Sequence, residues 1–216
     1  MEVHILSEQN SLVNQYLSEI RCKDIQQDSM RFRKNVERVG EIMAYEISKT
    51  LKWKDVDVTT PLGVAKVPVM VRQPILATIL RAGLMMHQGL LNAFDKAGNA
   101  FISAYRKHHD NGEFEIKIEY LSSPELNNRI LILSDPMIAT GSSMWLAYDA
   151  LLAQKGTPDH THVVSLIAST EGLEYVKKHF PDNTTFWIAA VDNELNSKSY
   201  IIPGLGDAGD LAYGAK

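Results

Sequence analysis

The sequence predicts a doubly wound α/β fold, with a mainly parallel sheet, flanking helices and a β-hairpin extension. Apolar runs without alternation suit strands that are buried on both faces. Four such runs occur, at residues 75–80, 101–105, 130–133 and 163–168. Helical spacing of apolar residues lies between several of them, at residues 84–94, 143–154 and 171–179. Repeated strand, helix and strand is typical of this fold class.

The remaining segments complete this architecture. Residues 33–51 carry apolar side chains at spacings of three and four, which predicts a helix. Residues 56–60 and 64–69 flank a Pro61-Leu62-Gly63 turn and predict a hairpin. Residues 113–121 alternate between polar and apolar, which indicates an antiparallel extension, and a fifth core strand is expected at residues 185–191.

The length of 216 residues and the 45% hydrophobic content suit one sizeable core. We therefore expect a single domain over residues 1–216. Within it we expect a helical N-terminal segment, at about residues 1–52, and a distinct C-terminal segment, at about residues 199–216. We find no internal repeat or interdomain linker.

Charge and composition narrow the class of protein. A net charge of -4 and no useful basic run argue against binding to nucleic acid or to a membrane surface. No apolar run approaches the roughly 20 residues that span a bilayer, and the N-terminus does not resemble a signal peptide. Cys22 is the single cysteine, which is ordinary in a reducing compartment. We expect a cytoplasmic protein.

The segment after the strand at residues 130–133 carries the chemistry. Asp135 ends the strand, and Thr140 and Gly141 precede a helix. The free N–H groups of a first helical turn bind phosphate, a glycine permits close approach, and an aspartate accepts hydrogen bonds from sugar hydroxyls. Arg81 and Arg106 follow two other strands, so an anionic, hydroxylated ligand is indicated. The alternative is a plain helix cap, made by Thr140 or Ser142.

Other motifs are weaker. Residues 204–209 match G-x-G-x-x-G, but a dinucleotide site needs a following helix and an acid about twenty residues on. The chain ends at Lys216, so this interpretation fails. His108-His109-Asp110 and the pair His160 and His162 lack further ligands at suitable spacing, which disfavours a transition-metal site.

Asp135-Pro136-Met137 followed by Ala139-Thr140-Gly141 resembles the phosphoribosyl-pyrophosphate (PRPP) loop of the type I phosphoribosyltransferases, and specifically that of the uracil phosphoribosyltransferases. Three other segments fit the same family: residues 80–84, Tyr105-Arg106 and residues 200–210. The resemblance implies transfer of the 5-phosphoribosyl group from PRPP to uracil, which gives UMP and pyrophosphate in pyrimidine salvage.

The resemblance also implies site residues. Those for PRPP are Arg81, Arg106, Asp135, Pro136, Met137, Ile138, Ala139, Thr140, Gly141, Ser142, Ser143 and Asp207. Those for uracil, largely through backbone groups, are Ile201, Gly206, Asp207 and Ala208. Asp135, Arg81 and Asp207 are the expected catalytic residues. Magnesium is expected mainly on substrate oxygens. A homo-oligomer and activation by GTP are further family expectations.

Some points stay open in the sequence. Residues 107–112 suit either a lid or an ordinary exposed hairpin loop. Ser142 and Met85 stand where the family usually has glycine; a positive φ there would be strained, whereas a helical backbone would tolerate both. Two alternatives to uracil transfer remain, namely transfer to another base and a regulatory protein that keeps the fold and acts on RNA.

Overall fold

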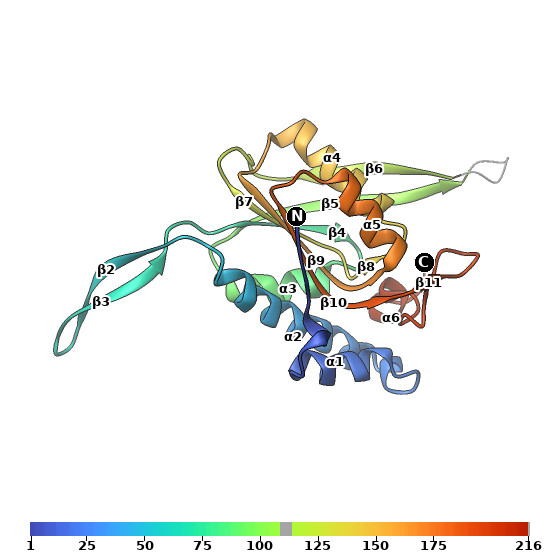
Figure 1. Cartoon of the computed structure of the whole chain (residues 1–216), viewed down its shortest axis with the longest axis horizontal. Coiled ribbons are helices and arrows are strands. Elements are labelled where there is room, and N and C mark those ends of the chain that lie inside the picture. Colours follow the sequence, from blue (N-terminus) through green and yellow to red (C-terminus); the bar gives the residue numbers. More distant parts are fainter. Residues whose placement is uncertain (109–113, 216) are drawn as a thin grey trace.

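The computed structural model describes residues 1–108 and 114–215, with the backbone alone at residues 104–108 and 114–117 (Figure 1). Its centre is an eight-stranded sheet in the order β1-β10-β9-β7-β4-β5-β6, with the short β8 paired to β9. The strands are β1 (Glu2–Ile5), β4 (Ile75–Leu80), β5 (Gly98–His108), β6 (Phe114–Ser122), β7 (Ile130–Ser134), β8 (Met137–Ile138), β9 (His160–Ser169) and β10 (Thr184–Asp192). All pairs are parallel except β5 with β6.

Helices cover both faces of this sheet, which confirms the doubly wound class. On one face lie α1 (Leu12–Arg21), α2 (Ser29–Ser48) and α3 (Leu84–Ala93). On the other face lie α4 (Ser142–Lys155) and α5 (Thr170–His179). The predicted strands and helices are all present, and β6 is the expected antiparallel extension. Within the described ranges, none of these helices has the length and apolar character needed to cross a membrane.

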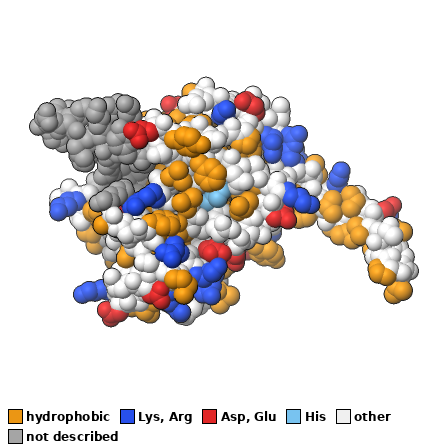
Figure 2. Space-filling view, turned by 180° about the vertical axis from the view of Figure 1, so that it is seen from behind, with side chains coloured by type: hydrophobic (Ala, Val, Ile, Leu, Met, Phe, Trp, Pro, Cys, Tyr) orange, Lys and Arg blue, Asp and Glu red, His pale blue; other side chains and the backbone are white. Residues whose placement is uncertain are grey.

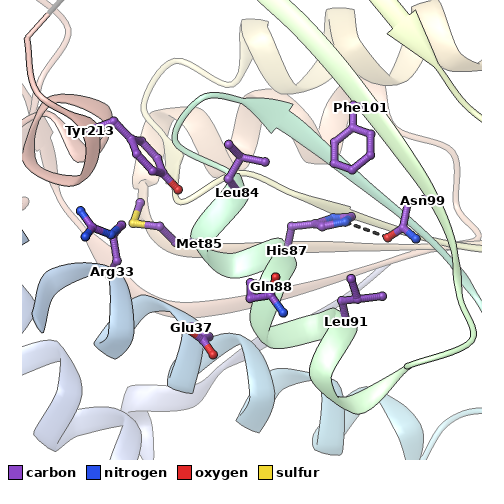
Figure 3. A pocket seen from close by; sticks show the side chains of 10 residues that line it. All are labelled: Arg33, Glu37, Leu84, Met85, His87, Gln88, Leu91, Asn99, Phe101 and Tyr213. Atoms are coloured by element: carbon purple, nitrogen blue, oxygen red, sulfur yellow. Dashed lines mark hydrogen bonds between the residues drawn. The ribbon is translucent and has the colours of Figure 1, made fainter. Parts of the chain in front are cut away.

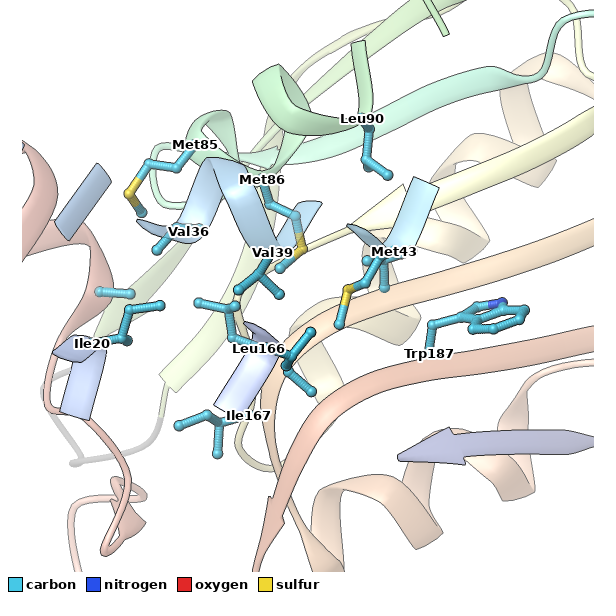
Figure 4. Close-up of a cluster of buried hydrophobic side chains, with 14 of the residues drawn as sticks. Ile20, Val36, Val39, Met43, Met85, Met86, Leu90, Leu166, Ile167 and Trp187 are labelled. Carbon is cyan, nitrogen blue, oxygen red and sulfur yellow. The ribbon is translucent and has the colours of Figure 1, made fainter. Parts of the chain in front are cut away.

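Each face of the sheet has its own buried cluster, because the central strands are apolar on both sides. All but the last residue of β4 and all but the first residue of β7 and β9 are buried. Figure 4 shows the cluster on the α2 side, where Val36, Val39 and Met43 of α2 lie near Met86 of α3 and Leu166 of β9. The spacing of those α2 residues is the one from which the helix was predicted.

The N-terminal segment differs from the expectation at its start. Residues 2–5 form β1, which pairs in parallel with β10 at the sheet edge, and only then does the chain become helical. The 3-10 turns η1 (Leu6–Glu8) and η2 (Ile25–Gln27) flank α1. A four-residue strand pattern is too short to separate from a loop in one sequence, and its partner lies near the other end of the chain.

Two small sheets lie outside the central one. The predicted hairpin consists of β2 (Trp53–Thr60) and β3 (Gly63–Met70), and it projects far from the body of the molecule (Figure 1). The second pair is β11 (Glu194–Leu195) with β12 (Ile201–Ile202), followed by the short helix α6 (Ala208–Tyr213). This C-terminal segment folds back beside the carboxyl end of β10.

Candidate active site

A cavity of about 600 Å³ opens at the carboxyl edge of the sheet, between the loop after β7 and the C-terminal segment. This is the edge where doubly wound folds bind ligands. The cavity brings together eleven of the residues expected from the sequence: Asp135, Met137, Ile138, Ala139, Thr140, Gly141, Ser143, Ile201, Gly206, Asp207 and Ala208. The two groups are far apart in the chain, so their meeting is decided by the fold.

The loop leading into α4 depends on a glycine in the left-handed region. Gly141 is the N-cap of α4 with a φ of 80°, and a Cβ there would lie 2.8 Å from the carbonyl oxygen of Gly172. Gly141 has no side chain to cap α4, but Thr140 Oγ1 accepts a long hydrogen bond of 3.5 Å from the N–H of Ser142, so a weak cap by Thr140 is present. The other N–H groups of the first turn remain available to a ligand at the cavity.

The local backbone explains why Ser142 and Met85 can stand at positions where the family usually has glycine. Ser142 is the first residue of α4, and Met85 is the second residue of α3. Neither has a positive φ. The helical alternative therefore holds at both positions. The hydroxyls of Ser142 and Thr140 lie 2.8 Å apart and are hydrogen bonded.

Asp135 follows the last residue of β7 and lines the cavity. Its Oδ1 accepts a weak hydrogen bond of 3.4 Å from the N–H of Met137. Burial is the main cause that raises the pKa of the Asp135 carboxyl to about 7; the hydrogen bond from the Met137 N–H opposes this shift, and the negative charge of Asp207 adds to it. A carboxyl in this state changes its charge near neutral pH, as acids and bases at active sites do.

The C-terminal segment contributes Tyr200, Ile201 and residues 206–209 to the cavity. Gly204 and Gly206 have φ values of 56° and 92°, which few other residues adopt. Asp207 caps α6, because its Oδ1 accepts from the N–H of Asp210 at 3.0 Å. Upstream, the Asn196 side chain accepts from the N–H groups of Lys198 and Tyr200 at 2.9 and 3.0 Å. The segment is thus held in one backbone conformation.

Four expected residues do not line the cavity. The guanidinium of Arg81 turns to α6 and the chain end, with Nη2 3.4 Å from Asp210 Oδ1 and 3.2 Å from the carbonyl oxygen of Gly214. Pro136 is buried behind the loop, and Ser142 faces Thr140. Arg106 has backbone in β5, but its side chain lies outside the described part, as do residues 109–112 of the segment interpreted as a lid or loop.

The cavity also includes residues that the sequence did not indicate. Lys198 and Ser199, from the turn before Tyr200, line it together with Ile79 of β4. Lys198 is exposed and lies in a polar turn. Its position directly before the family-like residues 200–210 was the only available signal for a cation at this place.

The histidine pair on β9 has ordinary structural partners. The Nε1–H of Trp187 donates to His162 Nδ1 at 3.1 Å, and His160 Nε2 lies 3.0 Å from the hydroxyl of Thr185. Burial, together with the nearby His160 and His4, lowers the pKa of His162 to about 3. Among the described residues, no group of three or more His, Cys, Asp or Glu is arranged to hold a metal ion.

A second cavity of about 490 Å³ lies between α2, α3, β5 and α6 (Figure 3). Its walls include Met85 and His87, whose Nε2 is 2.8 Å from Asn99 Oδ1. It contains neither the strand-end acid nor the loop before α4. The chemistry described above therefore belongs to the cavity at the carboxyl edge.

Comparison with known proteins gives a consistent result. The family model for uracil phosphoribosyltransferase matches residues 7–215. A uracil phosphoribosyltransferase from Porphyromonas gingivalis is 56% identical over 216 residues, which is all of both chains. One from Methanothermobacter thermautotrophicus is 42% identical over 207 residues, covering 95% of this chain and 93% of its own. A solved structure from Aquifex aeolicus has a TM-score of 0.86 at 31% identity, covering 98% of both chains.

Proposed function

Since the chain belongs to the uracil phosphoribosyltransferase family, we propose that the carboxyl-edge cavity is its active site, with PRPP on the loop after β7 and uracil on the C-terminal segment. The protein is an enzyme of pyrimidine salvage that transfers the phosphoribosyl group from PRPP to uracil and forms UMP. The single observation that carries the assignment of the site is the meeting of these two segments in one cavity.

PRPP lies on the loop of residues 135–143 in this proposal. The N–H groups at the start of α4 bind the 5-phosphate, and the hydroxyls of Thr140 and Ser143 add donors. Asp135 accepts hydrogen bonds from the ribose hydroxyls and favours the positive charge that the ring gains as pyrophosphate leaves. Uracil N1 forms the new bond to ribose C1 as the bond from C1 to pyrophosphate breaks; the pyrophosphate leaves with the electron pair, and the N1 proton passes to it or to water.

Uracil is read by the backbone around Ile201 and at residues 206–208. Fixed N–H and C=O groups match the edge of uracil, and the amino group of cytosine would leave them unpaired. The support is that Gly206 requires its positive φ and leaves the backbone uncovered, with no atom within 4 Å of an added Cβ.

Pyrophosphate release involves Arg81 and Arg106 in this proposal, because a fixed positive charge stabilises the departing anion. Arg81 already lies beside the C-terminal segment, where Asp210 holds its guanidinium at 3.4 Å. Binding of the pyrophosphate group would replace this weak, half-exposed contact.

Magnesium is the proposed cofactor. Asp135 and Asp207 line the same cavity, and the charge of Asp207 contributes to the raised pKa of Asp135. Two carboxylates with phosphate oxygens and water are a usual environment for Mg²⁺. When bound with PRPP, the ion would neutralise the charge of the pyrophosphate group. Chelation by EDTA should abolish turnover, and added Mg²⁺ should restore it.

The decisive assay is UMP formation by the purified protein with uracil, PRPP and Mg²⁺. Cytosine, orotate and hypoxanthine serve as matched controls for the acceptor base. Turnover is expected with uracil and not with the other bases. Turnover with a different base and none with uracil would reject the proposed acceptor.

We also propose a homo-oligomer, with support from the hairpin. Alternation and cross-strand pairing put Val56, Val58 and Val67 on one face of β2 and β3. Val58 and Val67 are each 38% exposed, and the arm displays hydrophobic side chains away from the body (Figure 2). A lone two-stranded hairpin is marginal in water, so a second copy of the chain is the proposed cover.

Sedimentation tests this assembly. Val58→Lys puts a charge on the apolar face and should lower the oligomeric mass, whereas Thr59→Lys alters the opposite face of the same strand and should not. Equal masses for wild type and both variants would count against hairpin-mediated assembly.

Activation by GTP and a cytoplasmic location complete the proposal. The unpaired, partly buried Cys22 suits a reducing compartment. For GTP, uracil turnover should rise with added nucleotide at fixed PRPP. The assay should be repeated at several protein concentrations, so that activation is separated from assembly.

A further inference from the structure

An ion pair between α1 and β10 fixes the C-terminal segment in place. This ion pair lies outside the proposed substrate positions. Arg21, the last residue of α1, makes two hydrogen bonds of 2.8 Å to the two carboxylate oxygens of Asp192. Asp192 is the last residue of β10 and is 8% exposed. Such a bidentate pair fixes both groups in geometry, not only in distance.

Both main-chain polar groups of Gly204 are bound by this pair. The Gly204 N–H donates to Asp192 Oδ2 at 2.9 Å, and its carbonyl oxygen accepts from Arg21 Nη1 at 3.0 Å. Gly204 itself cannot be replaced easily, since a Cβ there would lie 2.2 Å from the carbonyl oxygen of Ile201.

A neighbouring side chain holds the next residue. The Gln26 amide, in the orientation that satisfies its neighbours, donates to the carbonyl oxygens of Leu205 at 2.9 Å and Ile20 at 3.0 Å. Gln26 belongs to η2, directly after α1. The main chain at Gly204 and Leu205 is therefore fixed immediately before residues 206–208.

We propose that Arg21, Asp192 and Gln26 are positioning residues for uracil recognition, which act by fixing the backbone that reads the base. This inference rests on the proposed function. A side-chain reader can adjust its rotamer, but a backbone reader is only as well placed as the chain around it. Loss of the clamp should therefore affect the base more than PRPP, which lies on the loop after β7.

The charge state of the pair agrees with this geometry. Burial by itself would raise the pKa of Asp192, but the hydrogen bonds from Arg21 and the Gly204 N–H, with the charge of Arg21, lower it overall. Asp192 is thus ionised at neutral pH, where it pairs with the charged Arg21.

Steady-state kinetics of the full chain tests the proposal. Arg21→Lys keeps the charge but cannot make the bidentate contact and the bond to Gly204 together, whereas Gln26→Ala leaves that pair intact and removes the side-chain contacts to Leu205 and Ile20. For Arg21→Lys we expect a KM for uracil raised about tenfold, a KM for PRPP changed less than about twofold, and weaker rejection of cytosine. Gln26→Ala should show a smaller change in the same direction.

The matched control is the pair of Arg31 with Glu19, which is also bidentate, at 2.9 and 2.8 Å, and joins α1 to α2 without touching the C-terminal segment. Arg31→Lys should leave both KM values unchanged. Parallel rises in both KM values, or equal effects at Arg21 and Arg31, would overturn the proposal. Wild-type protein without uracil turnover would instead reject the proposed function, so the two failures are distinguishable.

Discussion

Asp135 is a residue at which binding chemistry and stability oppose one another. A carboxyl whose pKa is raised to about 7 by burial holds its proton more tightly in the folded than in the unfolded chain. The free energy of unfolding therefore falls as the pH rises from about 4 to 7. Above pH 7 the total loss is roughly 4 kcal/mol. Active sites often carry such a cost.

Asp135→Asn should accordingly be more stable than wild type at pH 8 and nearly equal to it at pH 4. Turnover should fall about 100-fold or more, because the ribose hydroxyls lose a charged acceptor. Thermal melts at both pH values, with kcat measured at pH 8, check the pair of outcomes. Wild-type activity in this variant would refute the role of Asp135.

Asp207 has a structural and a proposed chemical role, and two substitutions separate them. Asparagine is as good an N-cap as aspartate, whereas alanine costs about 1 kcal/mol at such a position. Asp207→Asn should keep the melting temperature while kcat/KM for PRPP falls, and Asp207→Ala should lower both. If kcat/KM is unchanged in the asparagine variant, Asp207 acts only as the N-cap of α6 and has no role in PRPP binding.

At the scale of elements, the start of α4 depends on the backbone of Gly141. An alanine there would keep a φ of 80° and place its Cβ within 3 Å of Gly172, Tyr175 and Val176. Gly141→Ala should lower stability by about 1–3 kcal/mol and raise the KM for PRPP. Gly156→Ala, at the positive-φ residue that ends the same helix, is the control, because it should lower stability and leave the KM for PRPP unchanged. Denaturant unfolding with KM measurements distinguishes the two.

At the scale of the whole molecule, buried histidines set the acid limit of stability. Burial lowers the pKa values of His87, His160 and His162. The unfolded chain therefore binds more protons below about pH 6.5, and stability falls as the pH drops from there. His162→Gln, which can still accept from Trp187, should reduce this fall. Melting temperatures at pH 4.5 and 7.5 give the comparison; an equal fall in both proteins would contradict the assignment.

The sequence by itself determined the core strands β4, β5, β7, β9 and β10, the helices α2 to α5, and the strand-end acid and glycine, whereas the full set of site residues came from the family resemblance. Runs such as residues 130–133, buried on both faces, have one reasonable place in a parallel sheet, and the acid and glycine after them fall at its carboxyl edge. These features are local, so periodicity and turn chemistry reveal them. The family resemblance added the substrates.

The tertiary structure alone decided what depends on distant parts of the chain. Strand β1 could not be seen before its partner β10, nor could the clamp of Arg21 on Asp192 and Gly204, whose members are up to 183 residues apart. The orientation of the Arg81 side chain toward Asp210 also depends on residues that are far apart in the chain. A single sequence shows which groups can bond, but only the packing of α1 and β10 brings Arg21 and Asp192 within 2.8 Å.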